Sequence, residues 1–331
     1  MTIKKNYQLD ELNFETKIGG QGIENDDFEI PIIDMSDFDE RREIITEQLW
    51  EAAAEVGFFQ LIHHGIPISE IEHAFAQSEA YFALPAAVKN KNALKAGQNA
   101  GWEFKSQIRP STGTQDQKES FQITVPNMTG CWPSDTVLLN FRRDMLAFED
   151  RCWRLGMQVL SCFADKLGFP VDFFSIAHDK SKQDYQSTLR LLHYLPMKTV
   201  PNDPKLWRAG AHTDFDCLTM VFQKEGQGGL QVCAGKNAKE QQSWTNAVPR
   251  TGVITCNIGD MLMRWSDDKL KSTLHRVRMP KPEESQASRY SMAFFCQANK
   301  KVVIEGPAKK YPAMTAEEYL QLRINANFNQ N

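Results

Sequence analysis

The chain has 331 residues, of which 41% are hydrophobic, enough to bury a large core either in one domain or in a barrel with a helical N-terminal part. Its formal net charge of −4 provides no basic surface for nucleic acid or an anionic membrane. No run approaches the ~18 apolar residues of a membrane-spanning helix, the first residues lack an apolar signal core, and the seven cysteines show no CxxC spacing. We therefore expect a cytoplasmic protein with scattered core thiols and no attachment to a membrane.

The first residues are polar, and this composition predicts that residues 1–28 form a lead-in outside the core. The run Gly19–Gly22 invites comparison with a phosphate-binding loop. No strand precedes this run and no Lys-Ser/Thr pair follows it, so that interpretation is disfavoured. Residues 29–180 then predict an N-terminal segment that is mainly helical.

Short strands and amphipathic helices are predicted within this segment. Strands are expected at residues 30–34 and 58–62. Apolar residues at helical spacing predict helices at residues 39–56, 68–82 and 134–167, and the first of these should stop at Gly57.

Four histidines of the N-terminal segment are weighed as metal ligands and given structural roles instead. His63 and His64 occupy a strand-to-turn step before Gly65, where an imidazole usually bonds to nearby backbone. His73, on the amphipathic helix, and His178, in a turn, are expected to be structural or solvated.

A histidine and a carboxylate separated by one residue, His212 and Asp214, occur within residues 181–310, which predict a barrel core. In an extended segment alternate side chains point to the same face, so both can reach one ion while Thr213 points away. His275 lies much later, and a folded double sheet can bring so distant a strand alongside. Two imidazoles and one carboxylate on one face of a metal leave the opposite positions open, which suits a non-haem iron(II) centre that activates dioxygen.

A second pair of residues at the same spacing follows this set. Arg289 and Ser291 open a run rich in aromatic residues that predicts a strand. Together they can present a planar guanidinium fork and a hydroxyl group to one carboxylate.

These residues resemble the iron(II)- and 2-oxoglutarate-dependent oxygenases of the isopenicillin N synthase-like group. The match rests on His212-x-Asp214, His275 and Arg289-x-Ser291, and the Gly-Phe-Phe-x-Leu-x-x-His-Gly-Ile-Pro phrase at residues 57–67 extends it to most of the chain. The resemblance implies a mostly β protein with flanking helices, in which a distorted double-stranded β-helix, or jelly roll, follows an α-rich N-terminal part.

The resemblance also implies Fe(2+) as the metal, with 2-oxoglutarate and O2 as cosubstrates. The iron ligands would be His212, Asp214 and His275, and the distal carboxylate of 2-oxoglutarate would meet Arg289, Ser291 and Tyr194. Two departures from the family pattern occur. The usual Asn-x-Tyr phrase is Leu-His-Tyr here, so that only the Tyr carries over and His193 should face away from it, and residues 280–286 add a turn before Arg289.

The resemblance supplies candidates for the substrate pocket as well. Phe104 lies in a segment that borders the pocket in relatives, and Phe215 and Trp265 could also line it, with core packing as the alternative for each. Four polar residues are expected either to orient a metal ligand or to close a turn: Asp216, Thr219, Asn257 and Asp260.

The implied function is a dioxygenase that hydroxylates, desaturates or cyclises a small molecule and releases succinate and CO2. Neither nucleic acid, nor a membrane, nor an obligate protein partner is expected. Two alternatives remain open: an isopenicillin N synthase-like oxidase that uses iron and O2 without 2-oxoglutarate, and a catalytically inactive jelly roll that binds a small ligand. A hydrolase is disfavoured because the sequence contains no Gly-x-Ser-x-Gly elbow.

Residues 311–331 predict a C-terminal helix and tail. The helix should span residues 315–324, with Thr315 as its N-cap. In isopenicillin N synthase a Gln near the chain end can occupy the metal before substrate arrives, and Gln330 is placed similarly, with a frayed terminus as the alternative.

Overall fold

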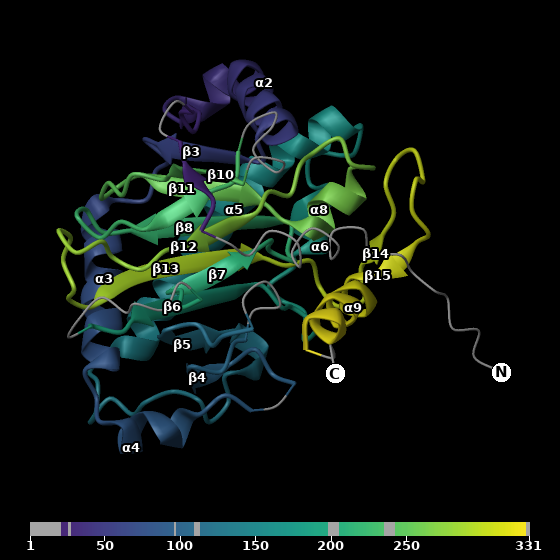
Figure 1. The fold of residues 1–331 in the computed structure, drawn as a ribbon. Helices are drawn as coiled ribbons and strands as arrows, with labels where there is room; N and C mark the ends of the chain where they lie inside the picture. Colours follow the sequence, from purple (N-terminus) through teal and green to yellow (C-terminus); the bar gives the residue numbers. More distant parts are fainter. Residues whose placement is uncertain are drawn as a thin grey trace.

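Two β-sheets lie face to face in the computed structural model, and helices cover the outer face of the larger sheet (Figure 1). The structure describes residues 21–25, 28–95, 97–108, 113–197, 205–234 and 242–328. Gln330 and the Gly19-Gly20 pair lie outside the described residues.

The larger sheet has eight strands, and both halves of the chain contribute to it. In spatial order its strands are β2 (Ile32–Asp34), β3 (Phe58–Ile62), β11 (Ile254–Ile258), β8 (Leu218–Gln223), β13 (Arg289–Cys296), β6 (Thr188–Tyr194), β5 (Lys118–Ile123) and β4 (Gly101–Phe104). Four of them, β2 to β5, come from the mainly helical N-terminal segment, so this segment forms both edges of the sheet.

The smaller sheet has five strands and carries two of the predicted metal ligands. Its order is β1 (Ile23–Glu24), β10 (Ser243–Asn246), β9 (Leu230–Val232), β12 (His275–Val277) and β7 (Ala209–His212). Strand β1 pairs in parallel with β10, which the polar character of the lead-in did not predict. A separate pair, β14 (Val303–Ile304) and β15 (Met314–Thr315), leads to the C-terminal helix.

The helices are α2 (Phe38–Glu55), α3 (Ile68–Phe82), α4 (Ala86–Lys89), α5 (Phe141–Leu167), α6 (Phe173–Ala177), α8 (Asp260–Trp265) and α9 (Ala316–Phe328). Short 3-10 turns, η1 (Asn90–Asn92) and η2 (Val125–Asn127), join the strands nearby. The long helix begins at Phe141 and not at residue 134 as predicted. Asn140 adopts a left-handed backbone conformation (φ 59°), and this conformation cannot continue a right-handed helix.

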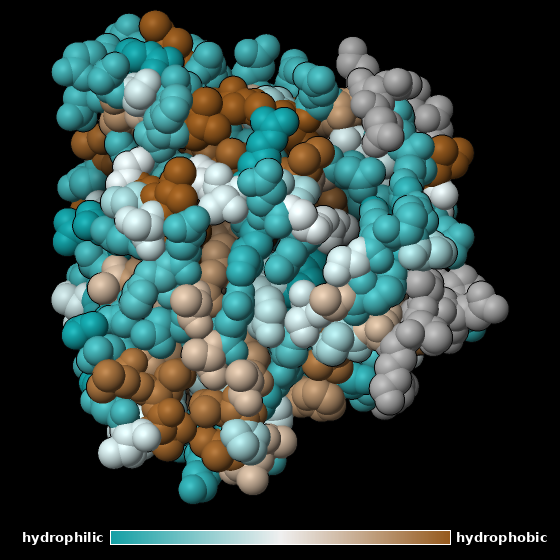
Figure 2. Space-filling model, turned by 90° about the vertical axis from the view of Figure 1, so that its left-hand side faces the viewer, coloured by the Kyte–Doolittle hydropathy of each residue, from teal (hydrophilic) through white to brown (hydrophobic). Residues whose placement is uncertain are grey.

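The apolar interior has two layers because successive residues of a strand point to opposite faces. On β6, Leu191 packs in the cluster between the larger sheet and the helices, whereas Leu192 and Tyr194 pack between the two sheets. There they join Val232 of β9 and Val277 of β12. On the side of the molecule drawn in Figure 2, hydrophilic residues cover most of the surface and apolar residues form separate patches.

This architecture confirms the predicted jelly roll with an α-rich N-terminal part. All seven cysteines are buried and free, as expected for core thiols. Among the helices of the described residues, none combines the length and the apolar character that crossing a bilayer requires.

The histidines of the N-terminal segment have structural partners. His63 contacts Asp34 through Nδ1 at 2.9 Å, His64 meets the Gly252 carbonyl through Nε2 at 3.0 Å, and His73 contacts Asp144 through Nε2 at 2.7 Å. These contacts agree with the structural role expected for the three histidines.

His178 at the end of α6 should make the stability of the fold depend on pH. Its ring is fully buried, Nδ1 lies 2.7 Å from the Phe174 carbonyl, and burial lowers the pKa of the ring to about 4. The unfolded chain binds a proton here near pH 6.5 and the folded chain does not, so stability is lost as the pH falls from about 6.5 towards 4. Between pH 7 and pH 5 this group should contribute a loss of about 2 kcal/mol.

We expect His178→Gln to remove this component, so that the difference in unfolding free energy between pH 7 and pH 5 becomes smaller than in the wild type. Urea unfolding of both proteins at the two pH values measures it. An equal difference in both proteins would contradict the assignment.

Candidate metal centre

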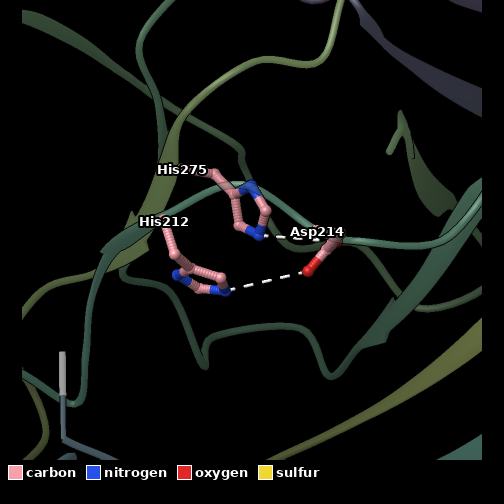
Figure 3. Close-up of side chains that lie close together, drawn as sticks. All are labelled: His212, Asp214 and His275. Atoms are coloured by element: carbon pink, nitrogen blue, oxygen red, sulfur yellow. Dashed lines mark ion pairs between the residues drawn. The ribbon is translucent and has the colours of Figure 1, made fainter. Parts of the chain in front are cut away.

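His212, Asp214 and His275 converge at one point between the sheets (Figure 3). His212 ends β7 and His275 begins β12, and the antiparallel pairing of these strands places the two residues directly opposite each other. Asp214 follows two residues after His212. One ligand atom of each residue lies within 4.8 Å of the others, with Asp214 Oδ1 at 3.8 Å from His212 Nε2 and Oδ2 at 3.6 Å from His275 Nε2.

The backbone selects which nitrogen of each imidazole faces the shared point. His212 Nδ1 lies 2.7 Å from the Gly210 carbonyl oxygen, and His275 Nδ1 lies 3.3 Å from that of Thr273. A carbonyl oxygen only accepts hydrogen bonds, so each Nδ1 carries the proton and donates it. The Nε2 lone pairs are therefore directed to the point that Asp214 also reaches.

Two polar residues orient the Asp214 carboxylate. Thr219 on β8 lies 2.6 Å from Asp214 Oδ2, and Asn257 on β11 donates to the same oxygen at 2.9 Å. Both are 1% exposed, so water does not compete for these bonds. Of the two roles that the sequence left open for Thr219 and Asn257, the geometry favours orientation of the ligand.

Asp216 lies behind this pair. Its burial, together with the negative charge of Asp214, raises its pKa well above the ordinary value, so the side chain favours its neutral form. A neutral Asp216 can donate to Thr219 Oγ1, which lies 3.1 Å from Asp216 Oδ2, and leave the Thr219 proton for Asp214.

The donor set fits a divalent transition metal. It comprises two neutral imidazole nitrogens and one carboxylate oxygen, each already oriented by a bond from its other side. Three protein ligands on one face leave the remaining coordination positions to small molecules, which is the arrangement found at non-haem iron(II) oxygenase centres.

Arg289 lies on β13 with its guanidinium fully enclosed. Nε donates to the carbonyls of Gln227 and Gly228 at 2.9 Å, Nη2 donates to Gln223 Oε1 at 3.1 Å, and the group stands 4.7 Å from the centroid of the Tyr194 ring. Burial lowers its pKa, and within the described ranges no carboxylate forms an ion pair with it. A buried cation without an anionic partner is costly, so this pocket fits the carboxylate of a ligand.

The two residues predicted to act with Arg289 lie beside it. Ser291 Oγ accepts from Arg289 Nη1 at 3.4 Å, and Tyr194 pairs directly with Arg289 across β6 and β13. His193 points to the opposite face, as expected, where its Nδ1 lies 2.7 Å from Glu119 Oε1.

Arg208, which the sequence analysis missed, adds a second buried cation. It is 4% exposed, and Nη2 donates to the Ala287 carbonyl at 3.4 Å. Burial, followed by repulsion from Arg289, lowers its pKa to about 10. In the described part of the chain Arg208 forms no ion pair either. Its importance could have been recognised only from the charge balance of the folded interior, which the sequence does not show.

The sequence analysis also missed a row of four side chains on the inner face of the larger sheet, which we call the polar strip. It runs from Phe295 through Arg190 and Gln122 to Glu103. Phe295 lies opposite Thr219, and thus next to the bond that orients Asp214. From there Arg190 stands 5.0 Å from the Phe295 ring centroid and donates to Gln122 Oε1 at 2.9 Å, and Gln122 donates to Glu103 Oε1 at 3.1 Å.

The far end of this strip reaches the surface. Burial alone would favour a neutral Glu103, but the charge of Arg190 and hydrogen bonds from Ser106 and Ser120 lower its pKa. Glu103 therefore stays ionised and compensates Arg190. It lines a crevice with Lys118 and Ser120 that is too narrow for a water molecule, and it also lines an adjoining open hollow of about 450 Å³.

The three predicted substrate-pocket residues lie in different surroundings. Phe104 is 50% exposed and lines the open hollow beside Glu103. The Phe215 ring stands 4.6 Å from the guanidinium carbon of Arg323. Trp265 is 0% exposed in the helical layer, where its ring meets Phe173 and Phe174, so core packing is the alternative that its position favours.

Comparison with known proteins identifies matches along most of the chain. Residues 185–298 match the family model of the 2OG-Fe(II) oxygenase superfamily, and residues 30–136 match that of the non-haem dioxygenase in morphine synthesis N-terminal family. A 2-oxoglutarate-dependent dioxygenase, traH, of Penicillium crustosum is 32% identical over 77% of this chain and 81% of its own. A proline hydroxylase, buaE, of Petromyces alliaceus is 31% identical over 89% of this chain and 98% of its own.

A solved structure is also similar. A full-length Neurospora crassa protein, crystallised with alpha-KG and thymine, superimposes with a TM-score of 0.78 and 30% identity, covering 92% of this chain and 99% of the other.

The hydrogen bond from Asn257 gives a direct test of the centre. We expect Asn257→Ala to weaken the binding of Mn(II) to the metal-free chain by about tenfold or more, because Asp214 loses a bond that orients it. Calorimetric titration measures this affinity.

Thr255→Val is the matched control. Thr255 lies on the same strand and face but bonds to Gln60 at 3.2 Å and not to Asp214. Equal weakening in the two variants would mean that Asn257 acts through general stability alone.

Proposed function

This chain belongs to the 2OG-Fe(II) oxygenase superfamily, and from that membership we propose which of its residues bind iron(II), 2-oxoglutarate and the substrate. The protein is an iron(II)- and 2-oxoglutarate-dependent dioxygenase that oxidises a small molecule, with O2 as the second cosubstrate. His212, Asp214 and His275 are proposed as the iron ligands. The observation that carries this proposal is their convergence from β7, the segment after it, and β12.

Arg289, Ser291 and Tyr194 are proposed to bind the distal carboxylate of 2-oxoglutarate. Support comes from the buried guanidinium, which has no carboxylate partner among the described residues and lies beside the Ser291 hydroxyl and the Tyr194 ring. Arg208 adds positive charge to the same region, which favours a cosubstrate that carries two carboxylates.

Bound iron(II), 2-oxoglutarate and O2 together supply the oxidation of a substrate C–H bond, with release of succinate and CO2. The chain's own residues contribute binding and orientation. Thr219 and Asn257 hold Asp214 in place, the carbonyls of Gly210 and Thr273 keep both imidazoles in one tautomer, and the apolar cluster between the sheets limits water around the site.

The polar strip is proposed as the substrate-binding surface. It begins beside the Asp214 carboxylate and ends at Glu103, which lines the open surface hollow, so its side chains connect the metal centre with the surface. The opposite charges of Arg190 and Glu103 compensate each other, which favours an uncharged substrate with hydrogen-bonding groups over an acid or an amine.

Phe104 and Phe215 stay among the proposed pocket residues. Phe104 lines the hollow that adjoins the strip, whereas Phe215 follows the metal ligand Asp214 directly.

The compartment and the division of the chain remain proposals too. Seven unpaired buried thiols and an iron(II) requirement favour a reducing, cytoplasmic location. We keep the division into residues 1–28, 29–180, 181–310 and 311–331 as a description of sequence segments, since strands from the second and third share one sheet.

The role of Arg289 is tested with a succinate-release assay on a panel of small molecules. Arg289→Ala should raise the 2-oxoglutarate concentration for half-maximal turnover by about 100-fold, because a charge-assisted pair is lost, and leave Mn(II) affinity unchanged. Arg289→Lys keeps the charge without the planar fork. Its 2-oxoglutarate concentration for half-maximal turnover should lie between those of the wild type and Arg289→Ala.

His212→Ala serves as the blank of this assay. An unchanged 2-oxoglutarate requirement in Arg289→Ala would place the anchor elsewhere. Substrate oxidation without succinate would indicate an oxidase that does not use 2-oxoglutarate, and substrate binding without turnover would indicate an inactive binding protein.

The proposed role of the polar strip in substrate binding is tested separately. The panel should begin with uncharged rings that carry carbonyl and N–H groups, such as thymine, the compound bound in the Neurospora crassa structure. Arg190→Met should raise the KM for an uncharged substrate by about 10- to 100-fold, through loss of a hydrogen bond to a charged group. Succinate release without substrate should stay at the wild-type rate, and an unchanged KM would exclude Arg190 from the substrate surface.

A further inference from the structure

The C-terminal helix α9 reaches the metal centre through one buried side chain. Figure 1 shows α9 beside β15, at the same end of the molecule as α8. Arg323 of α9 is 0% exposed, and its Nη2 forms an ion pair with Asp260 Oδ2 at 2.6 Å. Asp260 is the first residue of α8 and is likewise 0% exposed. The pair therefore joins two helices that are far apart in the sequence.

The same guanidinium contacts the segment that carries two of the proposed metal ligands. Nη2 donates to Thr213 Oγ1 at 3.0 Å, and the guanidinium carbon stands 4.6 Å from the ring centroid of Phe215. Thr213 lies between His212 and Asp214, and Phe215 follows Asp214. Arg323 thus contacts the residues on either side of the Asp214 ligand.

Asp260 completes the attachment of this segment. Its carboxylate accepts a bond from Thr213 Oγ1 at 2.9 Å, and its backbone N–H donates to the Asp214 carbonyl at 2.8 Å. The next N–H, that of Met261, donates to the Asp216 carbonyl at 3.1 Å. Side chain and backbone of the segment are both held at the start of α8.

The alternation of side chains gives these bonds a consequence for the ligands. In an extended segment His212 and Asp214 point to one face and Thr213 to the other. A change in the direction of Thr213 therefore turns both ligands. Arg323 suits this role because its planar fork can bond a carboxylate and a hydroxyl together, whereas a buried ion pair contributes little net stability by itself.

We propose that Arg323 is a positioning residue of the metal centre, which holds Thr213 against Asp260 and thereby fixes the directions of His212 and Asp214. This inference rests on the proposed function in one respect, the assignment of those two residues as metal ligands. By this inference, the C-terminal helix α9 helps to set the geometry of the metal site.

The experiment measures Mn(II) affinity of the full-length, metal-free chain by calorimetric titration, together with its thermal midpoint. Arg323→Met should weaken Mn(II) binding by about 10- to 100-fold, the range typical for residues that orient metal ligands. Arg323→Lys should recover part of the affinity. Because Arg323→Met removes the ion pair of the Asp260 carboxylate, the double variant Arg323→Met with Asp260→Asn is measured as well, and should show the same weakening.

Thr213→Val tests the contact between Arg323 and the ligand segment without disturbing the Arg323–Asp260 ion pair. It removes only the hydroxyl between Arg323, Asp260 and the ligand segment, so it should weaken Mn(II) binding while the thermal midpoint stays close to that of the wild type. Wild-type affinity in Thr213→Val would overturn the proposal, even if every Arg323 variant failed to fold.

Arg264 supplies the matched control for a merely structural effect. It is a second buried arginine, on α8, that contacts the C-terminal part, with its guanidinium carbon 4.4 Å from the Tyr311 ring and 5.7 Å from the Tyr319 ring. Arg264→Met should lower the thermal midpoint and leave Mn(II) affinity within about threefold of the wild type. Equal losses of affinity in Arg264→Met and Arg323→Met would overturn the proposal. Wild-type affinity in His212→Ala would instead overturn the metal-ligand assignment.

Discussion

The antiparallel pairing of β7 with β12 is the contact on which the candidate metal centre depends. It sets His212 opposite His275, and directly paired residues have Cα atoms only about 5 Å apart, so two imidazoles meet without any long side chain having to reach. The segment after β7 then brings Asp214 to the same point, where Thr219 and Asn257 of the other sheet fix it. Closure of the two sheets and assembly of the candidate metal ligands are therefore one structural event.

The space between the sheets combines an apolar lining with uncompensated positive charge. Leu192 and Val232 help to form its walls, yet Arg289 and Arg208 lie buried there, and in the described chain no carboxylate pairs with either. Such an interior is unfavourable by itself and becomes favourable when an anion enters. The requirement of the family for 2-oxoglutarate and the charge balance of this interior thus agree.

Local pattern was sufficient to predict the residues whose spacing reflects their chemistry. His212-x-Asp214 and Arg289-x-Ser291 each place two side chains on one face of a strand, and the structure brings the members of each pair together. Other features depend on which strands and helices become neighbours. Arg190 meets Gln122 across the β5–β6 register, and Arg323 meets Thr213 across 110 residues of chain. Likewise, the apolar periodicity of residues 134–167 did not indicate that Asn140 would delay the start of α5.

The shared sheet has an evolutionary consequence. Glu103 and Gln122 are on β4 and β5, strands of the N-terminal segment, whereas all three candidate metal ligands lie beyond residue 200. Substitutions in the first half of the gene can thus reshape the surface proposed to meet the substrate and leave the candidate metal ligands unchanged. A scaffold of this kind can change its specificity by drift at one edge strand pair.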